Sequence, residues 1–458
     1  MFLSTLFRAV LTVTGATITL ASVGPATDLR IVNSQISPDG FLREQVIILH
    51  HNITLLTHSL AVPSSPKGDT FLINVINELT DPTMLTSTSV HWHGLFQHGT
   101  NDMDGVSFVT QCPIPSNDSF QYHFSATDQA GTFWYHSHLA TQYCDGLRGP
   151  LVIYDPDDLH STLYDVDDES TVLTLADWYH VPAPEAGIVP TFDSTLINGL
   201  GRFVNGTQSP LAVVSVTAGK RKPSPLTILD GAETDATLGQ RYSFILNANQ
   251  TVGNYWIRAL PNRGTQTFDG GLNSAILRYA GAGNSDPDTT TTPSVHPMLE
   301  THLHCLTLQP GAPKPGGVDV QIELVVSVVD NETKFAVNGA IFEAPTVPVL
   351  LQILSGAKHA SELMPAGSVY SLPAKKTVEL NIPGGAIGGG HPVHLHGHNF
   401  AVVRSAGSDT LDYENPVWRD TVNIGTTVFD NATIRFTTDN PGPWFLHWCI
   451  QSSLNLTL

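Results

Sequence analysis

Apolar and polar residues alternate along short stretches of this sequence, for example in 71–75, 242–246, 378–382 and 434–436. An alternation with a period of two places the apolar side chains on one face of a β-strand. Clusters of glycine, proline, asparagine and aspartate separate the stretches, and patterns with the helical period are scarce. Many short strands with frequent turn signals are typical of β-sandwiches and barrels. The pattern therefore predicts an all-β protein.

The length of 458 residues allows two or three domains of ordinary size. Two acidic or proline- and threonine-rich stretches, 155–168 and 286–297, are candidate linkers between them. Residues 1–23 place Arg8 ahead of an apolar run and end in small residues, which is typical of a secretory signal peptide. No later stretch is apolar for long enough to span a bilayer. We therefore expect a secreted, extracellular protein that begins near Gly24 and has no membrane anchor.

Charge and cysteine content limit the partners and the compartment. A formal net charge of −20 argues against binding to nucleic acid or to anionic membrane surfaces. Secretion would expose several sequons to N-glycosylation. These sequons are at Asn52, Asn117, Asn205, Asn249, Asn331, Asn431 and Asn455. Secretion would also allow two disulfides among Cys112, Cys144, Cys305 and Cys449, although spacing alone does not choose their pairing.

The main candidate chemistry comes from histidine pairs separated by one residue. Three such pairs occur, namely His91-Trp92-His93, His136-Ser137-His138 and His394-Leu395-His396. On a strand the two imidazoles of a pair point to the same side, and neutral imidazole is a preferred ligand of zinc, copper, iron and nickel. One pair alone could be a surface or core couple, but the motif repeats, and His447 resembles half of a fourth pair. We expect the fold to bring the early and late histidines together around one polynuclear metal centre.

Four stretches resemble the copper signatures of fungal laccases, which are multicopper oxidases. They are His91-Trp92-His93-Gly94, Gly131-Thr132-Phe133-Trp134-Tyr135-His136-Ser137-His138, Tyr143-Cys144-Asp145-Gly146-Leu147-Arg148-Gly149-Pro150 and His391-Pro392-Val393-His394-Leu395-His396-Gly397-His398. The likeness extends from about Gly24 to His447, and as a set the motifs are highly specific. It implies three cupredoxin-like Greek-key domains, each a β-sandwich or barrel, at 24–158, 159–287 and 288–458. The second would be shortened and the third truncated.

The resemblance also implies a set of copper ligands. His91 and His394 match ligands of a type 2 copper, and His391 matches a ligand of a type 1 copper. The residues that match ligands of a pair of type 3 coppers are His93, His136, His138, His396 and His447. Asp104 matches a carboxylate that the family places near this trinuclear site for proton delivery, although an Asp-Gly dipeptide also suits an ordinary turn. The remaining histidines, His398 among them, are expected to be structural or surface residues.

Two internal segments depart from the family pattern. Residues 47–67 replace a short strand and its turn, and the histidines within them match no ligand motif. Those histidines are His50, His51 and His58. Residues 220–240 are shorter than the corresponding family segment, which would carry a carboxylate that contacts the reducing substrate and the disulfide partner of Cys144. We therefore expect Cys144 to remain a thiol.

The third departure lies at 448–458 and affects the expected type 1 copper. Trp448 stands at the position of the thiolate ligand, and Cys449 comes one residue later, so that its side chain should point with that of His447. The family tail would add a second type 1 histidine and the disulfide partner of Cys112. We therefore expect an incomplete type 1 site and a thiol at Cys112.

The resemblance implies a laccase. Such an enzyme couples the one-electron oxidation of phenols or aromatic amines, including lignin-type polyphenols, to the reduction of dioxygen to water. We expect a monomer. Two alternatives stay open because the type 1 site is incomplete: a non-catalytic copper-binding or regulatory paralogue, and a multicopper oxidase that acts on a metal ion such as ferrous iron.

Overall fold

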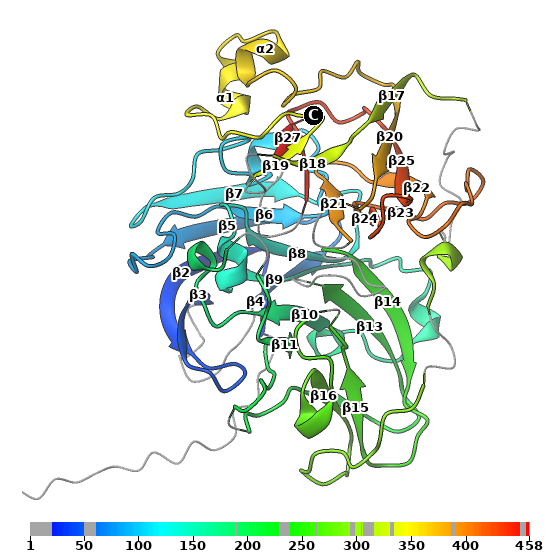
Figure 1. The fold of residues 1–458 in the computed structure, drawn as a ribbon. Coiled ribbons are helices and arrows are strands. Elements are labelled where there is room, and N and C mark those ends of the chain that lie inside the picture. Colours follow the sequence, from blue (N-terminus) through cyan, green and yellow to red (C-terminus); the bar gives the residue numbers. More distant parts are fainter. Residues whose placement is uncertain are drawn as a thin grey trace, which may run out of the picture.

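A computed structural model describes residues 21–49, 61–187, 190–206, 208–228, 239–261, 263–293, 298–303, 305, 316–329, 334–385, 390–448 and 455–457. Within these ranges the chain is built mainly of strands (Figure 1). The α-helices of the described part are α1 (Val349–Leu354) and α2 (Ala360–Leu363), and no helix there is long and apolar enough to cross a membrane. The prediction of an all-β protein is confirmed.

Two sheets from the first third of the chain share one hydrophobic core. In spatial order, the strands of the larger sheet are β1 (Ala21–Val23), β4 (Ala61–Pro66), β9 (Arg148–Tyr154), β8 (Gly131–Ser137) and β6 (Val90–His93). Those of the other sheet are β3 (Arg43–Leu49), β2 (Ala26–Ile36), β5 (Thr70–Asn77) and β7 (Ser119–Ser125). Phe71, Ile73 and Val75 of β5 are fully buried in this core, as their alternation predicts.

The first strand overlaps the predicted signal peptide. β1 pairs with β4 in parallel, and Val23 is buried in the core between the two sheets. The signal peptide at 1–23, with its boundary near Gly24, stays a prediction. His50, His51 and His58 lie outside the described residues.

The middle of the chain forms a second pair of sheets. In spatial order, the strands of the larger sheet are β11 (Ser194–Ile197), β10 (Leu173–Trp178), β13 (Arg221–Ile228) and β14 (Arg241–Asn247). Those of the smaller sheet are β12 (Val213–Val216), β16 (Ser274–Tyr279) and β15 (Asn254–Arg258). The alternation in 242–246 correctly predicts the strand β14. It also predicts that the apolar side chains are buried, and this is wrong for Phe244, which is 45% exposed. Among the described strands, β14 has a neighbour on one side only and is therefore an edge strand of this sheet.

The last part of the chain forms a third group of sheets around its own core. The strands of the largest sheet are β17 (Val320–Glu323), β20 (Thr377–Pro383), β25 (Asn431–Thr437), β22 (Phe400–Arg404) and β23 (Trp418–Arg419). Those of the next are β24 (Thr421–Asn423), β21 (Pro392–Leu395), β26 (Phe445–Trp448) and β27 (Asn455–Thr457). A two-stranded sheet joins β18 (Val326–Val329) to β19 (Lys334–Val337). In Figure 1, β21 lies near β6 and β8 of the first pair, and ring contacts between His93 and His394 confirm the proximity.

No disulfide is formed between the cysteines that the structure describes. Cys112 is exposed and Cys305 is half-buried, and neither forms a disulfide with another described residue. Cys144 is buried against Tyr179 and Phe192, and Cys449 lies outside the described residues. The thiols expected at Cys112 and Cys144 stay predictions.

Candidate metal centre

The pairing of β6 with β8 forms the early half of the site. Its register places His91 opposite His136, and His138 follows directly after β8. The ring centroid of His91 is 5.4 Å from that of His136 and also 5.4 Å from that of His138. His91, His93 and His136 are all buried. The two early histidine pairs therefore present their imidazoles to one buried region.

The pairing of β21 with β26 forms the late half in the same way. Its register places His394 opposite His447, and His396 follows directly after β21. The ring centroid of His396 is 4.5 Å from that of His394 and 5.1 Å from that of His447. The two histidines of the pair therefore lie on one side of the strand, and a third imidazole from the neighbouring strand lies beside them.

The two halves meet face to face. His93 stacks on His394, with ring centroids 3.7 Å apart and an interplanar angle of 16°. The rings of His91 and His396 are 4.0 Å apart. The structure contains three groups of residues in which the ligand atoms of the group lie within 4.8 Å of one another. They are His91 with His93 and His394, His138 with His396 and His447, and His91 with Asp104 and His396. The structure therefore brings the early and late histidines together, as the two-ended sequence pattern predicts.

Hydrogen bonds at the outer ring nitrogens orient the imidazoles. His91 Nδ1 donates to the carbonyl oxygen of Asp104 at 2.6 Å, and His394 Nδ1 donates to that of Asp420 at 2.8 Å. His136 and His447 each donate from Nδ1 to the carbonyl of the following residue, at 2.8 Å and 2.9 Å. A carbonyl oxygen can only accept, so Nδ1 carries the proton in each neutral ring and Nε2 keeps its lone pair. Such partners are typical of histidines that bind metal through the other nitrogen.

The inner ring nitrogens suit a metal ion. The Nε2 atoms of His91, His136 and His394 are buried and have no hydrogen-bond partner among the described residues. The Nε2 atom of His447 is 3.0 Å from that of His396 and 3.3 Å from that of His138. Two nitrogens that bind the same ion, each at about 2.0 Å and with a near-tetrahedral angle between them, lie roughly 3.3 Å apart. A set of imidazole donors with these spacings fits copper.

Burial keeps the imidazoles uncharged. Desolvation is the largest cause that lowers the pKa of five of these rings well below the usual value, and neighbouring imidazoles lower it further. The five are His93, His136, His138, His394 and His396. Burial also lowers the pKa of His447 to about 3. At neutral pH these rings can therefore offer a lone pair without first losing a proton.

Asp104 lies inside the same region. It follows the short 3₁₀-helix η1 (Asn101–Met103), and its side chain is fully buried. Its Oδ2 accepts a hydrogen bond from His396 Nδ1 at 2.9 Å, and its Oδ1 lies 3.3 Å from His91 Nδ1. Gly105 adopts the left-handed region at φ +85°, where a side chain would clash with the backbone of Val90. Asp104-Gly105 is thus a turn, and that turn delivers a carboxylate to the histidines.

His391 lies apart from this group and contacts an indole. The ring of Trp448 stacks on it, with centroids 4.4 Å apart and an interplanar angle of 16°, and Phe335 packs edge-on against Trp448 at 5.3 Å. Trp448 is buried at the end of β26 and pairs with Val393. Trp448 thus lies beside His391, while the assignment of His391 to a type 1 copper stays a prediction. Cys449 lies outside the described residues, so the direction of its side chain stays a prediction.

Sequence reasoning missed Asp420, which contacts histidines from both halves. Its carboxylate Oδ1 is 3.5 Å from His93 Nε2, and its carbonyl oxygen accepts from His394. Burial alone would raise the pKa of the Asp420 carboxyl, but the charge of Arg241 and the interaction with His93 hold it well below the usual range. A lone aspartate has no spacing signal. Only the pairing of β24 with β21, which places Thr421 opposite His394, reveals its position.

The histidines that match no ligand motif stay outside the cluster where the structure describes them. His398 is buried, and its Nε2 lies 3.9 Å from Asp439 rather than near the other imidazoles. His180 bonds to Asp39 through Nε2 at 2.8 Å. Neither occurs in the groups of converging ligand atoms found among the described residues. The structural role expected for His398 agrees with this placement.

The sequence also matches known proteins along most of its length. Family models described as multicopper oxidase match residues 31–158, residues 169–223 with 232–282, and residues 342–453. Laccase-1 of Pleurotus ostreatus is 53% identical over 96% of this chain and 89% of its own length. Laccase-2 of Trametes versicolor is 52% identical over 95% of this chain and 89% of its own length.

Solved structures show the same fold. The crystal structure of a laccase from Botrytis aclada matches with a TM-score of 0.76 and 27% identity, over 97% of this chain and 88% of that chain. Fet3p, described as a multicopper oxidase that functions in iron import, matches with a TM-score of 0.75 over 96% of this chain and 90% of that chain. Its identity is 23%, so this likeness concerns the fold alone. The resemblance predicted from the motifs is confirmed, and the chain belongs to the multicopper oxidase family.

Proposed function

We propose that this protein is a laccase by family, an oxidoreductase of the kind that couples oxidation of phenols or aromatic amines to reduction of dioxygen to water. Because Trp448 stacks on His391 where a thiolate ligand is expected, we propose that electron entry from phenols is impaired in this chain, while its histidine cluster can still reduce dioxygen. The observation that carries the proposal is the buried convergence of histidines from both ends of a chain that is 53% identical to a fungal laccase. The relatives do not favour a non-catalytic copper-binding paralogue. A metal-ion oxidase is not favoured either, because the match to the iron-import oxidase concerns the fold alone.

We propose that seven imidazoles hold copper. His91 and His394 would bind one ion of type 2. The ligands of a type 3 pair would be His93, His136, His138, His396 and His447. Bound there, copper would supply the redox chemistry that passes electrons to dioxygen. The protein's own contribution is to keep the imidazoles neutral, to orient them through carbonyl groups and to bury them away from water.

Asp104 is proposed as the group that holds and delivers a proton at this centre. Reduction of dioxygen to water consumes protons, and Asp104 is the carboxylate that groups with His91 and His396 among the converging ligand atoms. The Asp104 carboxylate lies between His91 and His396, within 3.3 Å of both Nδ1 atoms. A carboxylate in such contact can act as a general acid or base.

We further propose the setting in which the protein works. The three groups of sheets would be the domains at 24–158, 159–287 and 288–458. Phenolic and aromatic amine substrates, including lignin-type polyphenols, would come from outside the cell, and the chain would act as a secreted monomeric glycoprotein without a membrane anchor. The exposed positions of Asn117 and Asn205 agree with glycosylation.

The decisive experiment separates dioxygen reduction from phenol oxidation. The full chain is loaded with copper and dialysed, its copper is counted, and oxygen uptake is followed with a small inorganic reductant. We expect retained copper and oxygen consumption without accumulation of hydrogen peroxide. A chelator-treated sample is the control. Copper no higher than in that control, or peroxide as the main product, would show that the histidines do not form the proposed centre.

Replacing Asp104 with asparagine tests the proton-holding group. The amide oxygen can still accept from His396, so copper content should stay near that of the parent. Loss of general acid–base function should slow oxygen uptake by about 10²–10⁴-fold. Asp39→Asn is the matched control, because Asp39 is also fully buried and bonded to a histidine, His180, away from the cluster. Equal rates in the two variants would contradict the role of Asp104.

A further inference from the structure

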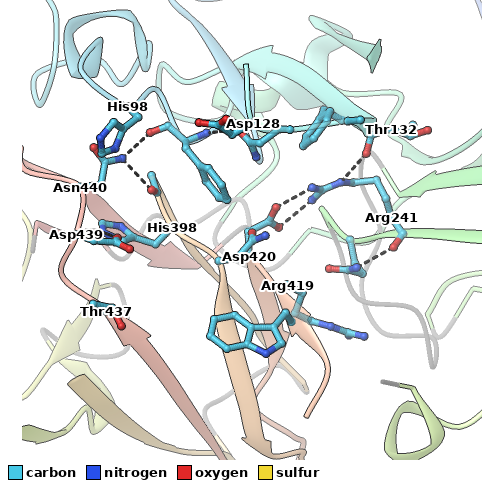
Figure 2. A pocket seen from close by; sticks show the side chains of 18 residues that line it. His98, Asp128, Thr132, Arg241, His398, Arg419, Asp420, Thr437, Asp439 and Asn440 are labelled. Atoms are coloured by element: carbon cyan, nitrogen blue, oxygen red, sulfur yellow. Dashed lines mark hydrogen bonds and ion pairs between the residues drawn. The ribbon is translucent and has the colours of Figure 1, made fainter. Parts of the chain in front are cut away.

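Arg241 connects the second pair of sheets to the other two groups. It is the first residue of β14, and its guanidinium donates to both oxygens of the Asp420 carboxylate, at 2.8 Å to Oδ1 and 2.7 Å to Oδ2. Its Nε donates to the carbonyl oxygen of Thr132 in β8 at 3.1 Å. Figure 2 shows these contacts. Only a planar guanidinium can make this fork and reach a third acceptor, because an ammonium group is a point charge without fixed geometry.

Asp420 transmits this contact to two histidines of the cluster. Its carbonyl oxygen accepts from His394 Nδ1 at 2.8 Å, and its Oδ1 lies 3.5 Å from His93 Nε2. The hydroxyl of Thr421 donates to the same Oδ1 at 2.9 Å and lies 3.4 Å from His93 Nε2. The partner of the outer nitrogen sets the direction of the inner nitrogen of an imidazole. The orientation of His93 and His394 therefore depends on where Asp420 is held.

Two glycines leave space, one for the ion pair and one for the ring of His93 beside it. Gly94 directly follows His93 in the first histidine motif and has a φ of +92°. A side chain there would clash with both Arg241 and Asp420. Gly239 has a φ of +76°, and its carbonyl oxygen accepts from Arg241 Nη1 at 3.0 Å. A Cβ at Gly239 would lie 2.9 Å from Cε1 of His93. The backbone around the histidines is thus shaped to fit the guanidinium and its partner.

The pair also borders a cavity. Arg241 and Asp420 line a space of about 840 Å³ whose other walls include Phe133, Trp418 and Asn440 (Figure 2). The side chain of Arg241 is 14% exposed, whereas that of Asp420 is 2% exposed. The ion pair therefore has one side on the cavity and the other toward His93. A small solute in the cavity can reach the position of the guanidinium.

We propose that Arg241 is a positioning residue of the metal centre: by fixing Asp420, it sets the orientation of His93 and His394 from a different pair of sheets. This inference rests on the proposed copper ligands. It assigns to β14 a role in a site whose ligands all lie in the first and last groups of sheets. Among the described residues, the hydrogen bonds of Arg241 reach Thr132, Gly239 and Asp420, so its hydrogen-bonded route to the proposed ligands passes through Asp420.

Arg241→Met and Arg241→Lys test the proposal, with Arg435→Met as the matched control. Arg435 also forms a buried ion pair, with Glu379 at 2.6 Å, but it lies in the core sheet of the last group. We expect Arg241→Met to weaken copper affinity by about 10–100-fold, the range typical for partners that orient metal ligands. The electron paramagnetic resonance signal of the type 2 copper should change as well. Arg241→Lys should lose less affinity, and Arg435→Met should keep both copper affinity and signal.

Chemical rescue separates positioning from folding. Ethylguanidinium at millimolar concentration, added to Arg241→Ala, should enter the cavity and restore part of the copper affinity and the type 2 signal. The same concentration of ethylammonium should restore less. If Arg241→Met does not fold, Arg241→Lys decides, and an affinity and signal equal to those of the parent would overturn the inference. A parent that retains no copper would overturn the proposed function and this inference together. A parent that retains copper, matched by Arg241→Met in affinity and signal, would overturn this inference alone.

Discussion

Replacing His394 with asparagine should abolish oxygen uptake driven by a small reductant and lower copper affinity by more than the ~10–100-fold expected for a residue that only orients a ligand. His394 is fully buried, stacks on His93 at 3.7 Å, and presents an Nε2 atom that has no hydrogen-bond partner among the described residues. An amide cannot supply the same neutral nitrogen at that position. Copper counting and oxygen uptake on the purified variant measure the effect.

His398→Asn provides the comparison that gives this result its meaning. His398 comes four residues later and is also buried, but its Nε2 lies 3.9 Å from Asp439 and away from the converging ligand atoms. It should therefore lose some stability without losing copper. If both variants lose copper equally, the effect of His394 reflects general damage to the fold rather than the loss of a ligand.

The unaltered protein, which has Trp448, should show no intense blue colour after copper loading. Its oxygen uptake with a methoxyphenol should be negligible. A blue copper site needs a thiolate and two histidines in a trigonal arrangement. Trp448 instead stacks on His391 at 4.4 Å, and its indole N–H is a donor that offers no lone pair to a metal. Uptake driven by a small reductant should persist, because the proposed cluster does not include His391. The visible spectrum and the oxygen electrode provide the two measurements.

Trp448→Cys and Trp448→Ser show whether the missing thiolate is the cause. Both replace a buried indole by a small side chain and share a packing cost of roughly 3–5 kcal/mol. Only the cysteine variant should gain a visible copper–thiolate band, because its sulfur would stand beside His391. An intensely blue parent chain would contradict this account and would indicate that Cys449 binds copper.

The strand pattern and the histidine pairs could be predicted because both depend on local periodicity. Phe71, Ile73 and Val75 alternate and are buried, because a second sheet covers that face. Each His-X-His pair converges for the same reason, since residues two apart share a side of the strand. The edge position of β14 is set by distant pairing, and the exposure of Phe244 could not be predicted from the alternation in 242–246.

The supporting groups of the site could not be predicted for a related physical reason. Asp420 reaches the cluster through the pairing of β24 with β21, and Arg241 reaches Asp420 from a strand 179 residues earlier in the chain. Neither residue belongs to a repeated motif. Their roles follow from contacts between sheets, which a pattern along one segment does not contain.

The division of the cluster between the two ends of the chain has a consequence for biosynthesis. His138 and His447 are separated by 309 residues. At about 5–20 residues per second, a ribosome needs roughly 15–60 s to make that segment. During this delay the four early imidazoles have no opposing half, and metal ions bound by them would lack the three late ligands, His394, His396 and His447. Copper is therefore expected to enter the completed chain, and the nascent chain must keep its four early histidines from capturing other ions.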